Sequence, residues 1–138
     1  RVHCPMDGEL KHMVHVPGRL FSVNESTTTS IPAVFARNER VIMHFKGKNG
    51  PFSVVLIGAM LVASIETPIS GLVTPPGRGI TEWSYHRGTH HKFIQGDEIG
   101  RFQYGSTVIV VIPKSKKGFS SDISHGYTVK LGQSLGQL

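Results

Sequence analysis

The chain has 138 residues, a length that favours one domain with its own hydrophobic core. Its 16 glycines and 8 prolines indicate a turn-rich, strand-rich fold and argue against a helical bundle. The net charge of +6 and the pI of about 9.8 favour an anionic partner, which is a lipid surface, a nucleic acid or an acidic ligand. With a single cysteine, Cys4, the fold does not depend on an internal disulfide, and we expect a small buried thiol.

Short predicted strands alternate with turns along the chain. Around Val41, Met43 and Phe45, apolar residues recur at every second position, which is typical of a strand with one buried face. Asn49-Gly50 follows, and this pair favours a tight hairpin turn. The segment 26–30 is rich in Ser and Thr and predicts a polar loop. The same reasoning predicts strands at residues 9–16, 40–46, 52–57, 69–73, 107–112 and 127–131.

Residues 51–65 form the longest apolar run of the chain. A helix that spans a bilayer needs about 20 residues, so this run is too short for that role. Gly58 divides the run, and its Val and Ile content predicts two buried strand segments. We therefore expect a mainly β chain that contacts a membrane only peripherally.

Gly105-Ser106-Thr107 interrupts residues 100–110, which otherwise have the composition of a strand. Glycine has no Cβ, so it adopts strained backbone conformations and lets a nucleophile approach its carbonyl carbon. The hydroxyl of Ser106 follows directly in the chain. This pattern suits a chain that cuts itself between Gly105 and Ser106, although the same tripeptide is also ordinary turn chemistry.

Five further segments give this tripeptide a context. They are Arg1-Val2-His3-Cys4-Pro5-Met6-Asp7-Gly8 and residues 16–24, 35–41, 57–66 and 96–102. In this order and spacing, residues 1 to about 111 resemble phosphatidylserine decarboxylase of the bacterial membrane type, and residues 126–136 are loosely similar. The resemblance implies a compact two-sheet antiparallel β core with short turns, like the hybrid fold of the sugar-phosphotransfer IIA and lipoyl-type domains.

The resemblance also implies the chemistry of the tripeptide. Ser106 would attack the carbonyl carbon of Gly105 and become a covalent pyruvoyl group, which forms a Schiff base with the substrate. Residues 1–138 would form one catalytic core domain that matures to a β chain, 1–105, and an α chain, 106–138. The helical membrane-docking region that precedes this core in the family is expected to be absent.

His3 falls where the family carries its catalytic histidine, so the resemblance makes it the expected general base and acid. The aspartate that orients this histidine lies upstream of the matching motif in the family. Within the chain, Asp7 and Asp97 are the nearest acidic candidates by motif, and Asp7 in Met6-Asp7-Gly8 suits a turn better.

The candidate substrate-binding residues are Phe21, Phe35, Arg37 and Arg40. The two aromatic residues flank a loop that could enter a lipid interface, and ordinary core packing is the alternative. The two arginines could pair with a phosphate or carboxylate through their forked donors, or be plain surface charges. Asn38-Glu39 could fix this loop instead of touching the substrate.

His86, His90 and His91 raise the question of a metal site. Adjacent histidines usually point apart, and no Cys or carboxylate nearby completes a ligand set, so we expect no metal. The lysines of segment 114–117 form a basic cluster that could attract anionic lipid, and a solvated turn is the simpler interpretation.

The expected function is the conversion of phosphatidylserine to phosphatidylethanolamine and CO2 in phospholipid biosynthesis. The expected partners are phosphatidylserine in an anionic membrane and, after self-cleavage, the two chains themselves; a homodimer stays an open alternative. The expected location is the cytoplasmic face of the cell membrane, with peripheral attachment. The alternative function is a non-catalytic β domain that binds anionic lipid or another acidic partner. A nucleic-acid module is disfavoured, because few aromatic residues accompany the basic ones.

Overall fold

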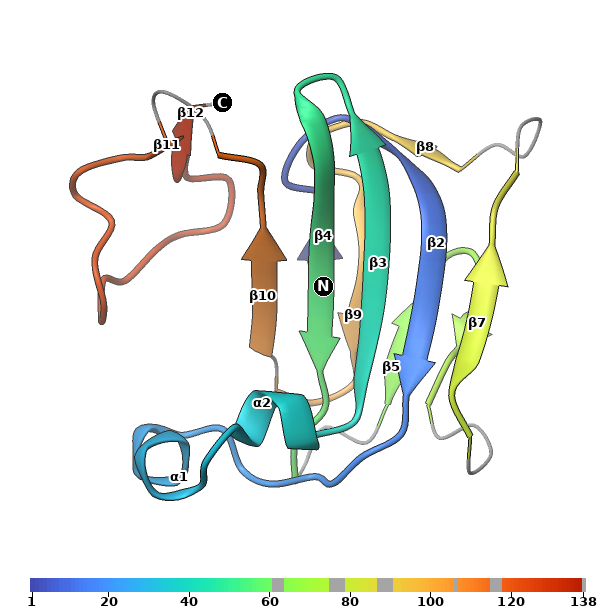
Figure 1. Cartoon of the computed structure of the whole chain (residues 1–138). Coiled ribbons are helices and arrows are strands. Elements are labelled where there is room, and N and C mark those ends of the chain that lie inside the picture. The colour runs from blue at the N-terminus through green and yellow to red at the C-terminus, as the bar shows by residue number, and fades with distance from the viewer. Residues whose placement is uncertain (61–63, 75–78, 87–90, 106, 115–117, 138) are drawn as a thin grey trace.

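Two antiparallel sheets pack against one another in the computed structural model of the chain (Figure 1). The structure describes residues 1–60, 64–74, 79–86, 91–105, 107–114 and 118–137. Two short helices lie at one end of the larger sheet, below the ends of its strands in Figure 1. The chain is therefore mainly β and built on two sheets, as predicted; the likeness to the lipoyl-type fold stays a prediction.

The larger sheet has six strands and carries most of the core. Its strands are β2 (Gly8–Val16), β3 (Arg40–Gly47), β4 (Gly50–Ile57), β7 (Thr81–Ser84), β8 (Lys92–Phe93) and β10 (Thr107–Val111). The order across the sheet is β10-β4-β3-β2-β7, and β8 pairs with the beginning of β2. The β3–β4 hairpin closes where predicted, because Gly47 pairs with Gly50 and Gly50 has a φ of 122°.

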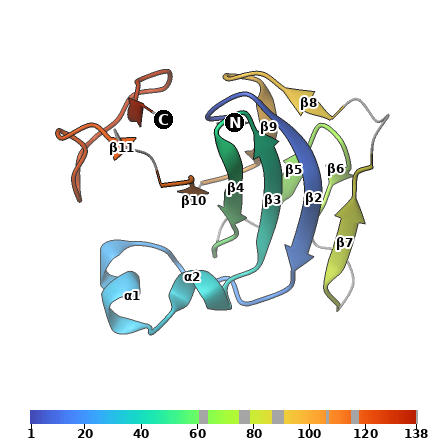
Figure 2. The same cartoon turned by 45° about the horizontal axis from the view of Figure 1, so that its top comes forward.

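The smaller sheet has the strand order β1-β9-β5-β6. Its strands are β1 (Val2–His3), β5 (Ile65–Thr67), β6 (Gly71–Leu72) and β9 (Glu98–Phe102). A separate pair, β11 (Gly118–Phe119) and β12 (Gly136–Gln137), stands beyond β10, away from both sheets (Figures 1 and 2).

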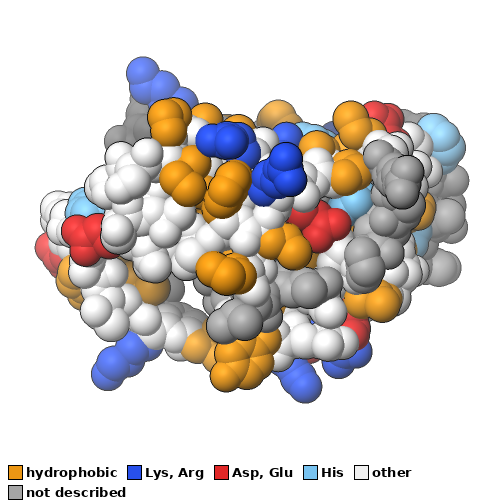
Figure 3. All heavy atoms as spheres, turned by 90° about the horizontal axis from the view of Figure 1, so that it is seen from below, with side chains coloured by type: hydrophobic (Ala, Val, Ile, Leu, Met, Phe, Trp, Pro, Cys, Tyr) orange, Lys and Arg blue, Asp and Glu red, His pale blue; other side chains and the backbone are white. Residues whose placement is uncertain are grey.

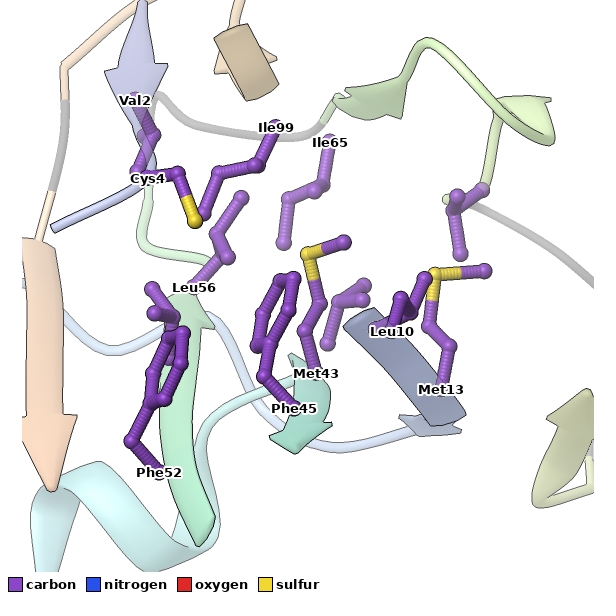
Figure 4. Packing of buried hydrophobic residues seen from close by; sticks show 13 residues of the cluster. Val2, Cys4, Leu10, Met13, Met43, Phe45, Phe52, Leu56, Ile65 and Ile99 are labelled. Carbon is purple, nitrogen blue, oxygen red and sulfur yellow. The ribbon is translucent and has the colours of Figure 1, made fainter. Parts of the chain in front are cut away.

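The core fills the space between the two sheets (Figure 4). The six-stranded sheet contributes Leu10, Met13, Met43, Phe45, Phe52 and Leu56, and the four-stranded sheet contributes Val2, Ile65 and Ile99. The rings of Phe45 and Phe52 stack with their centroids 4.8 Å apart. A Cβ at Gly100 would lie 2.8 Å from Leu56 Cδ2, so glycine is needed where β9 approaches the other sheet. The buried face of β3 is the one that its alternating sequence predicted.

The helices were not predicted. Helix α1 (Glu25–Ser30) takes the place of the expected polar loop at 26–30, because the Asn24 side chain accepts a hydrogen bond from the Thr27 backbone N–H at 2.9 Å and caps the first turn. Helix α2 (Val34–Arg37) follows after Ala33, which has a φ of 55°. Neither described helix has the length or the apolar character of a bilayer-spanning segment.

The strand predictions at 9–16, 40–46, 52–57 and 107–112 are confirmed to within two residues. The strand expected at 69–73 is reduced to β6. The strand expected at 127–131 is wrong, because this segment has no strand partner and leaves Tyr127, Val129 and Leu131 exposed by 45%, 49% and 85%. The second strand segment expected after Gly58 falls partly on residues 61–63, which lie outside the described residues.

Candidate active site

The predicted cleavage junction lies in the connection between β9 and β10. Gly105 is exposed and has a φ of 67°, a left-handed conformation that favours glycine. Ser106 itself lies outside the described residues. On its other side, Thr107 begins β10 and pairs with Ile57, the last residue of β4.

The junction lies at one end of the larger sheet, where β4 ends and β3 begins. Ile57 pairs with both Thr107 and Arg40, and Arg40 pairs in turn with Val16. Helix α2 lies at this same end, next to the lower ends of β4 and β10 (Figure 1). The strand register thus brings segment 38–40, which ends 65 residues before Gly105 in the chain, to the region of the junction.

Asn38 is the centre of a buried hydrogen-bond network at this end. Its Nδ2 donates to Phe21 O at 2.8 Å and to Gly58 O at 2.9 Å, and its Oδ1 accepts from Phe21 N at 3.0 Å. The next residue, Glu39, accepts from Gly58 N through its backbone carbonyl at 2.8 Å. Asn38 is fully buried, and the polar atoms of its side chain all form hydrogen bonds within the protein. This supports the interpretation that Asn38 fixes the loop over the alternative that it touches the substrate.

The carboxylate of Glu39 is held from the core side by a histidine. His15 Nε2 lies 2.9 Å from Glu39 Oε1, and the side chains are exposed by 0% and 12%. The other ring nitrogen of His15 is buried and has no hydrogen-bond partner among the described residues. Sequence reasoning missed this pair, since 24 residues separate its members and only the β2–β3 pairing brings them together.

The segment before α1 packs closely on the same network. A Cβ at Gly18 would lie 2.6 Å from Arg37 O and from Glu39 N, so only glycine permits this approach. The neighbouring Arg19 donates its N–H to Arg37 O and accepts from Glu39 N, at 2.8 Å each. The two segments therefore form one tightly joined unit.

The four candidate substrate-binding residues fall into two groups. Phe21, Phe35 and Arg37 lie near the molecular surface, and the Arg37 guanidinium stands 4.9 Å from the centroid of the Phe21 ring. Arg40 is half-buried, and its Nη1 donates to Ala36 O at 2.8 Å and to Asn38 O at 3.0 Å. The Arg40 side chain is therefore engaged in holding the end of α2.

We call the surface around α2 the α2 face, defined by the exposed residues Arg19, Leu20, Phe35 and Arg37. The apolar members are exposed by 38% at Leu20 and 37% at Phe35. Seen from this end of the molecule, hydrophobic and Lys or Arg side chains are interspersed (Figure 3). A surface with this composition can bind an anionic lipid layer through both of its components.

His3 lies in the smaller sheet, on β1, opposite Glu98. Its Nδ1 is buried and has no hydrogen-bond partner in the described part of the chain. Glu98 is the first residue of β9, and Gly105 comes three residues after the last residue of β9. Ser106 lies outside the described residues, so the pairing of His3 with this serine stays a prediction.

The acidic candidates and the cysteine have other contacts. Asp7 Oδ1 accepts from Gln95 N at 2.8 Å, and Asp97 Oδ2 accepts from Ile94 N at 2.9 Å, so both carboxylates hold the turn before β9. Cys4 is 2% exposed, and burial raises the pKa of its thiol to about 11. Cys4 is therefore a neutral buried thiol near pH 7, as predicted.

Of the three histidines considered for a metal, His90 lies outside the described residues. The ring of His91 packs edge-on against Tyr85, with centroids 4.3 Å apart. The described ranges contain no group of three His, Cys, Asp or Glu side chains arranged to hold a metal ion.

A hollow of about 560 Å³ lies beside the smaller sheet, away from the four candidate substrate residues. Its lining residues are Glu66, Thr67, Pro68, Gly71, Lys92, Phe93, Asp97, Glu98 and Arg101. Within it, Arg101 and Glu66 form an ion pair at 2.7 Å, so its opposite charges largely satisfy one another.

The chain matches the phosphatidylserine decarboxylase family over residues 1–137. It is 48% identical over 138 residues to the phosphatidylserine decarboxylase proenzyme of Ectopseudomonas mendocina, covering 99% of this chain and 48% of that protein. The proenzyme of Marinobacter nauticus is 46% identical over 138 residues, covering 100% of this chain and 48% of the relative. The chain spans about half the length of these curated relatives. By sequence, the chain belongs to the phosphatidylserine decarboxylase family.

Proposed function

We propose that this chain is the catalytic core of a self-processing, pyruvoyl-dependent phosphatidylserine decarboxylase. The observation that carries the proposal is the family match over residues 1–137, which includes Gly105-Ser106. The exposed, left-handed Gly105 between two strands supports it, since a residue without a Cβ leaves room for a nucleophile to approach.

Self-cleavage would proceed in three steps: an acyl shift, an elimination and a hydrolysis. The Ser106 hydroxyl oxygen attacks the Gly105 carbonyl carbon, and the peptide C–N bond breaks, so that an ester replaces the amide. A base removes the Ser106 α-proton, and the bond between Ser106 Cβ and the ester oxygen breaks. This elimination releases Gly105 as a carboxylate and leaves a dehydroalanine. Tautomerisation and hydrolysis of this residue then consume one water, release ammonia and leave a pyruvoyl group.

The sheet holds the two products together in this proposal. Strand β10 lies after the cut, and it pairs with β4, before the cut, along its whole length from Thr107 to Val111. Five residue pairs in one antiparallel ladder join the chains without a covalent bond. The mature protein would thus be a β chain of residues 1–105 and an α chain of residues 106–138.

His3 is the proposed base, and two observations bear on its action. Its buried, unpartnered Nδ1 suits a carboxylate that would fix the tautomer and leave Nε2 to take the proton. Asp7 and Asp97 each accept a backbone N–H from the turn before β9, so we assign that role to neither of them.

A pyruvoyl group at position 106 supplies a carbonyl that takes up the electrons released when the serine carboxyl leaves as CO2. The chain's own part is to hold the lipid. Phe21, Phe35 and Arg37 lie at the same end of the sheet as the junction, where Arg37 offers a forked donor to a phosphate or carboxylate. Arg40 would act indirectly, by holding α2.

The α2 face gives the proposed location. Its exposed Leu20 and Phe35 would enter the interfacial region of the membrane, and Arg19 and Arg37 would meet anionic headgroups. Because the junction lies at this end, a bound bilayer would present phosphatidylserine to it. We propose peripheral attachment at the cytoplasmic face of the cell membrane.

The test is decarboxylation by the complete protein on vesicles that contain phosphatidylserine, with phosphatidylethanolamine measured by mass spectrometry. We expect phosphatidylethanolamine to appear with the wild type and not with Ser106→Ala. If the wild-type protein is cleaved and binds the vesicles but leaves phosphatidylserine unchanged, the decarboxylase proposal is wrong and a non-catalytic lipid-binding domain replaces it.

A further inference from the structure

Gly58 is the residue through which a buried network reaches the cleavage junction. It follows β4 directly, next to Ile57, whose partner Thr107 begins β10. Its backbone N–H donates to Glu39 O at 2.8 Å, and its carbonyl accepts from Asn38 Nδ2 at 2.9 Å. Both polar groups of the Gly58 backbone are thus held by two consecutive residues from the connection between α2 and β3.

Asn38 and Glu39, which bind Gly58, are held in place by further hydrogen bonds. Asn38 makes two more hydrogen bonds, to both backbone polar groups of Phe21, and Glu39 is bound by His15 at 2.9 Å. His15 and Asn38 are both 0% exposed. Buried polar groups are costly to leave unpaired. The network therefore strongly favours the one arrangement of its side chains in which these hydrogen bonds form.

We propose that Asn38 is a positioning residue for self-cleavage, which acts through Gly58 to set where β4 ends and β10 begins. The inference rests on the proposed self-cleavage at Gly105. Attack of a hydroxyl on the preceding carbonyl depends on the alignment of the two groups, and a displacement of about 1 Å at such a site can slow a reaction by about 100-fold. The amide of Asn38 touches neither Gly105 nor Thr107 and acts only by fixing the strand end beside them.

The experiment compares Asn38→Ala with the wild type in the complete protein. The readout is the rate at which the two fragments appear after synthesis, followed by intact mass spectrometry. Met43→Ala is the matched control, because Met43 is fully buried on β3 but takes no part in the network. The thermal unfolding midpoints of both variants are measured, and their cleavage rates are then compared at temperatures equally far below each midpoint.

Asn38→Asp separates hydrogen bonding from packing and decides the question if Asn38→Ala does not fold. It keeps the size of the side chain and an acceptor for Phe21 N, but it lacks the donor to Gly58 O. Glu39→Gln is the conservative rescue, since its amide can still bond to His15 while Glu39→Ala cannot.

We expect cleavage of Asn38→Ala and Asn38→Asp to slow by about 10- to 100-fold relative to Met43→Ala, and Glu39→Gln to cleave much faster than Glu39→Ala. If the folded Asn38 variants are cleaved as fast as Met43→Ala, the positioning role is wrong, although self-cleavage itself stands. If the wild-type protein is not cleaved at all, the proposed function fails, and the inference fails with it.

Discussion

His15 and Glu39 form a buried pair across the β2–β3 ladder, with Nε2 and Oε1 2.9 Å apart. Glu39 precedes β3, and His15 is the penultimate residue of β2, so the pair fastens the end of the sheet at which the cleavage junction lies. This contact links the hydrophobic core to the loop that carries Asn38. Its removal is expected to affect both stability and self-processing.

His15→Leu should lower the free energy of unfolding by about 3–5 kcal/mol, because it leaves a largely buried carboxylate without its partner. Denaturant unfolding measures this change. Arg1→Gln is the control, since the Arg1–Glu98 pair is exposed by 59% and 31% and is expected to contribute at most about 1 kcal/mol. Equal effects of the two substitutions would show that the buried pair is no more stabilising than a surface contact.

Gly105→Ala should slow self-cleavage. An L-residue in the left-handed conformation costs roughly 1–2 kcal/mol, so alanine would shift the backbone beside the attacked carbonyl. Gly96→Ala is a matched control, because Gly96 also has a positive φ, of 92°, and has open space around it. The rate of fragment formation is the measurement, and an unchanged rate for Gly105→Ala alone would contradict a role for this conformation.

Phe35→Ser and Leu20→Ser should weaken binding to vesicles that contain phosphatidylserine, because each removes apolar surface from the α2 face. Leu131→Ser serves as the control, since Leu131 is 85% exposed but lies in the C-terminal segment. Sedimentation with vesicles measures the bound fraction. If Leu131→Ser weakens binding as much as the α2-face variants do, the membrane does not dock specifically at α2.

Acid sensitivity should depend on His44, whose Nδ1 lies 2.8 Å from Ser53 Oγ. Burial, and secondly the charge of the nearby His12, lower the pKa of His44 below its usual value of 6.5. As the pH falls below about 6.5, the unfolded chain therefore binds more protons than the folded one, and stability is lost as the pH falls through the folded-state pKa.

The His44→Gln variant removes this titration, so its stability should fall less than that of the wild type as the pH is lowered from 7 through the folded-state pKa of His44. Thermal midpoints measured across this range make the comparison. Parallel curves for the two proteins would assign the acid sensitivity to other groups.

The sequence was most informative where local pattern and tertiary packing agree. Alternation at Val41, Met43 and Phe45 predicts the buried face of β3, and all three side chains are at most 2% exposed. Asn49-Gly50 likewise predicts the hairpin turn. The same kind of pattern failed at 127–131, because no neighbouring strand covers it.

Other features depend on contacts between distant segments. Helix α1 was missed although Asn24 carries a capping signal, since its Ser and Thr residues favour loops when read without their context. The roles of Asn38 and His15 depend on strand register, which periodicity does not provide. Gly105 and His3 were singled out by family resemblance, and their catalytic roles stay predictions; the structure adds that His3 pairs with Glu98 on β9.

Intact mass spectrometry of the purified complete protein under denaturing conditions distinguishes a self-processed chain from an uncut one. Self-processing predicts two species that meet at Gly105, the second beginning with a pyruvoyl group in place of Ser106, and a single uncut species for Ser106→Ala. A wild-type protein that remains one chain with an intact Gly105-Ser106 bond would contradict self-processing at this junction.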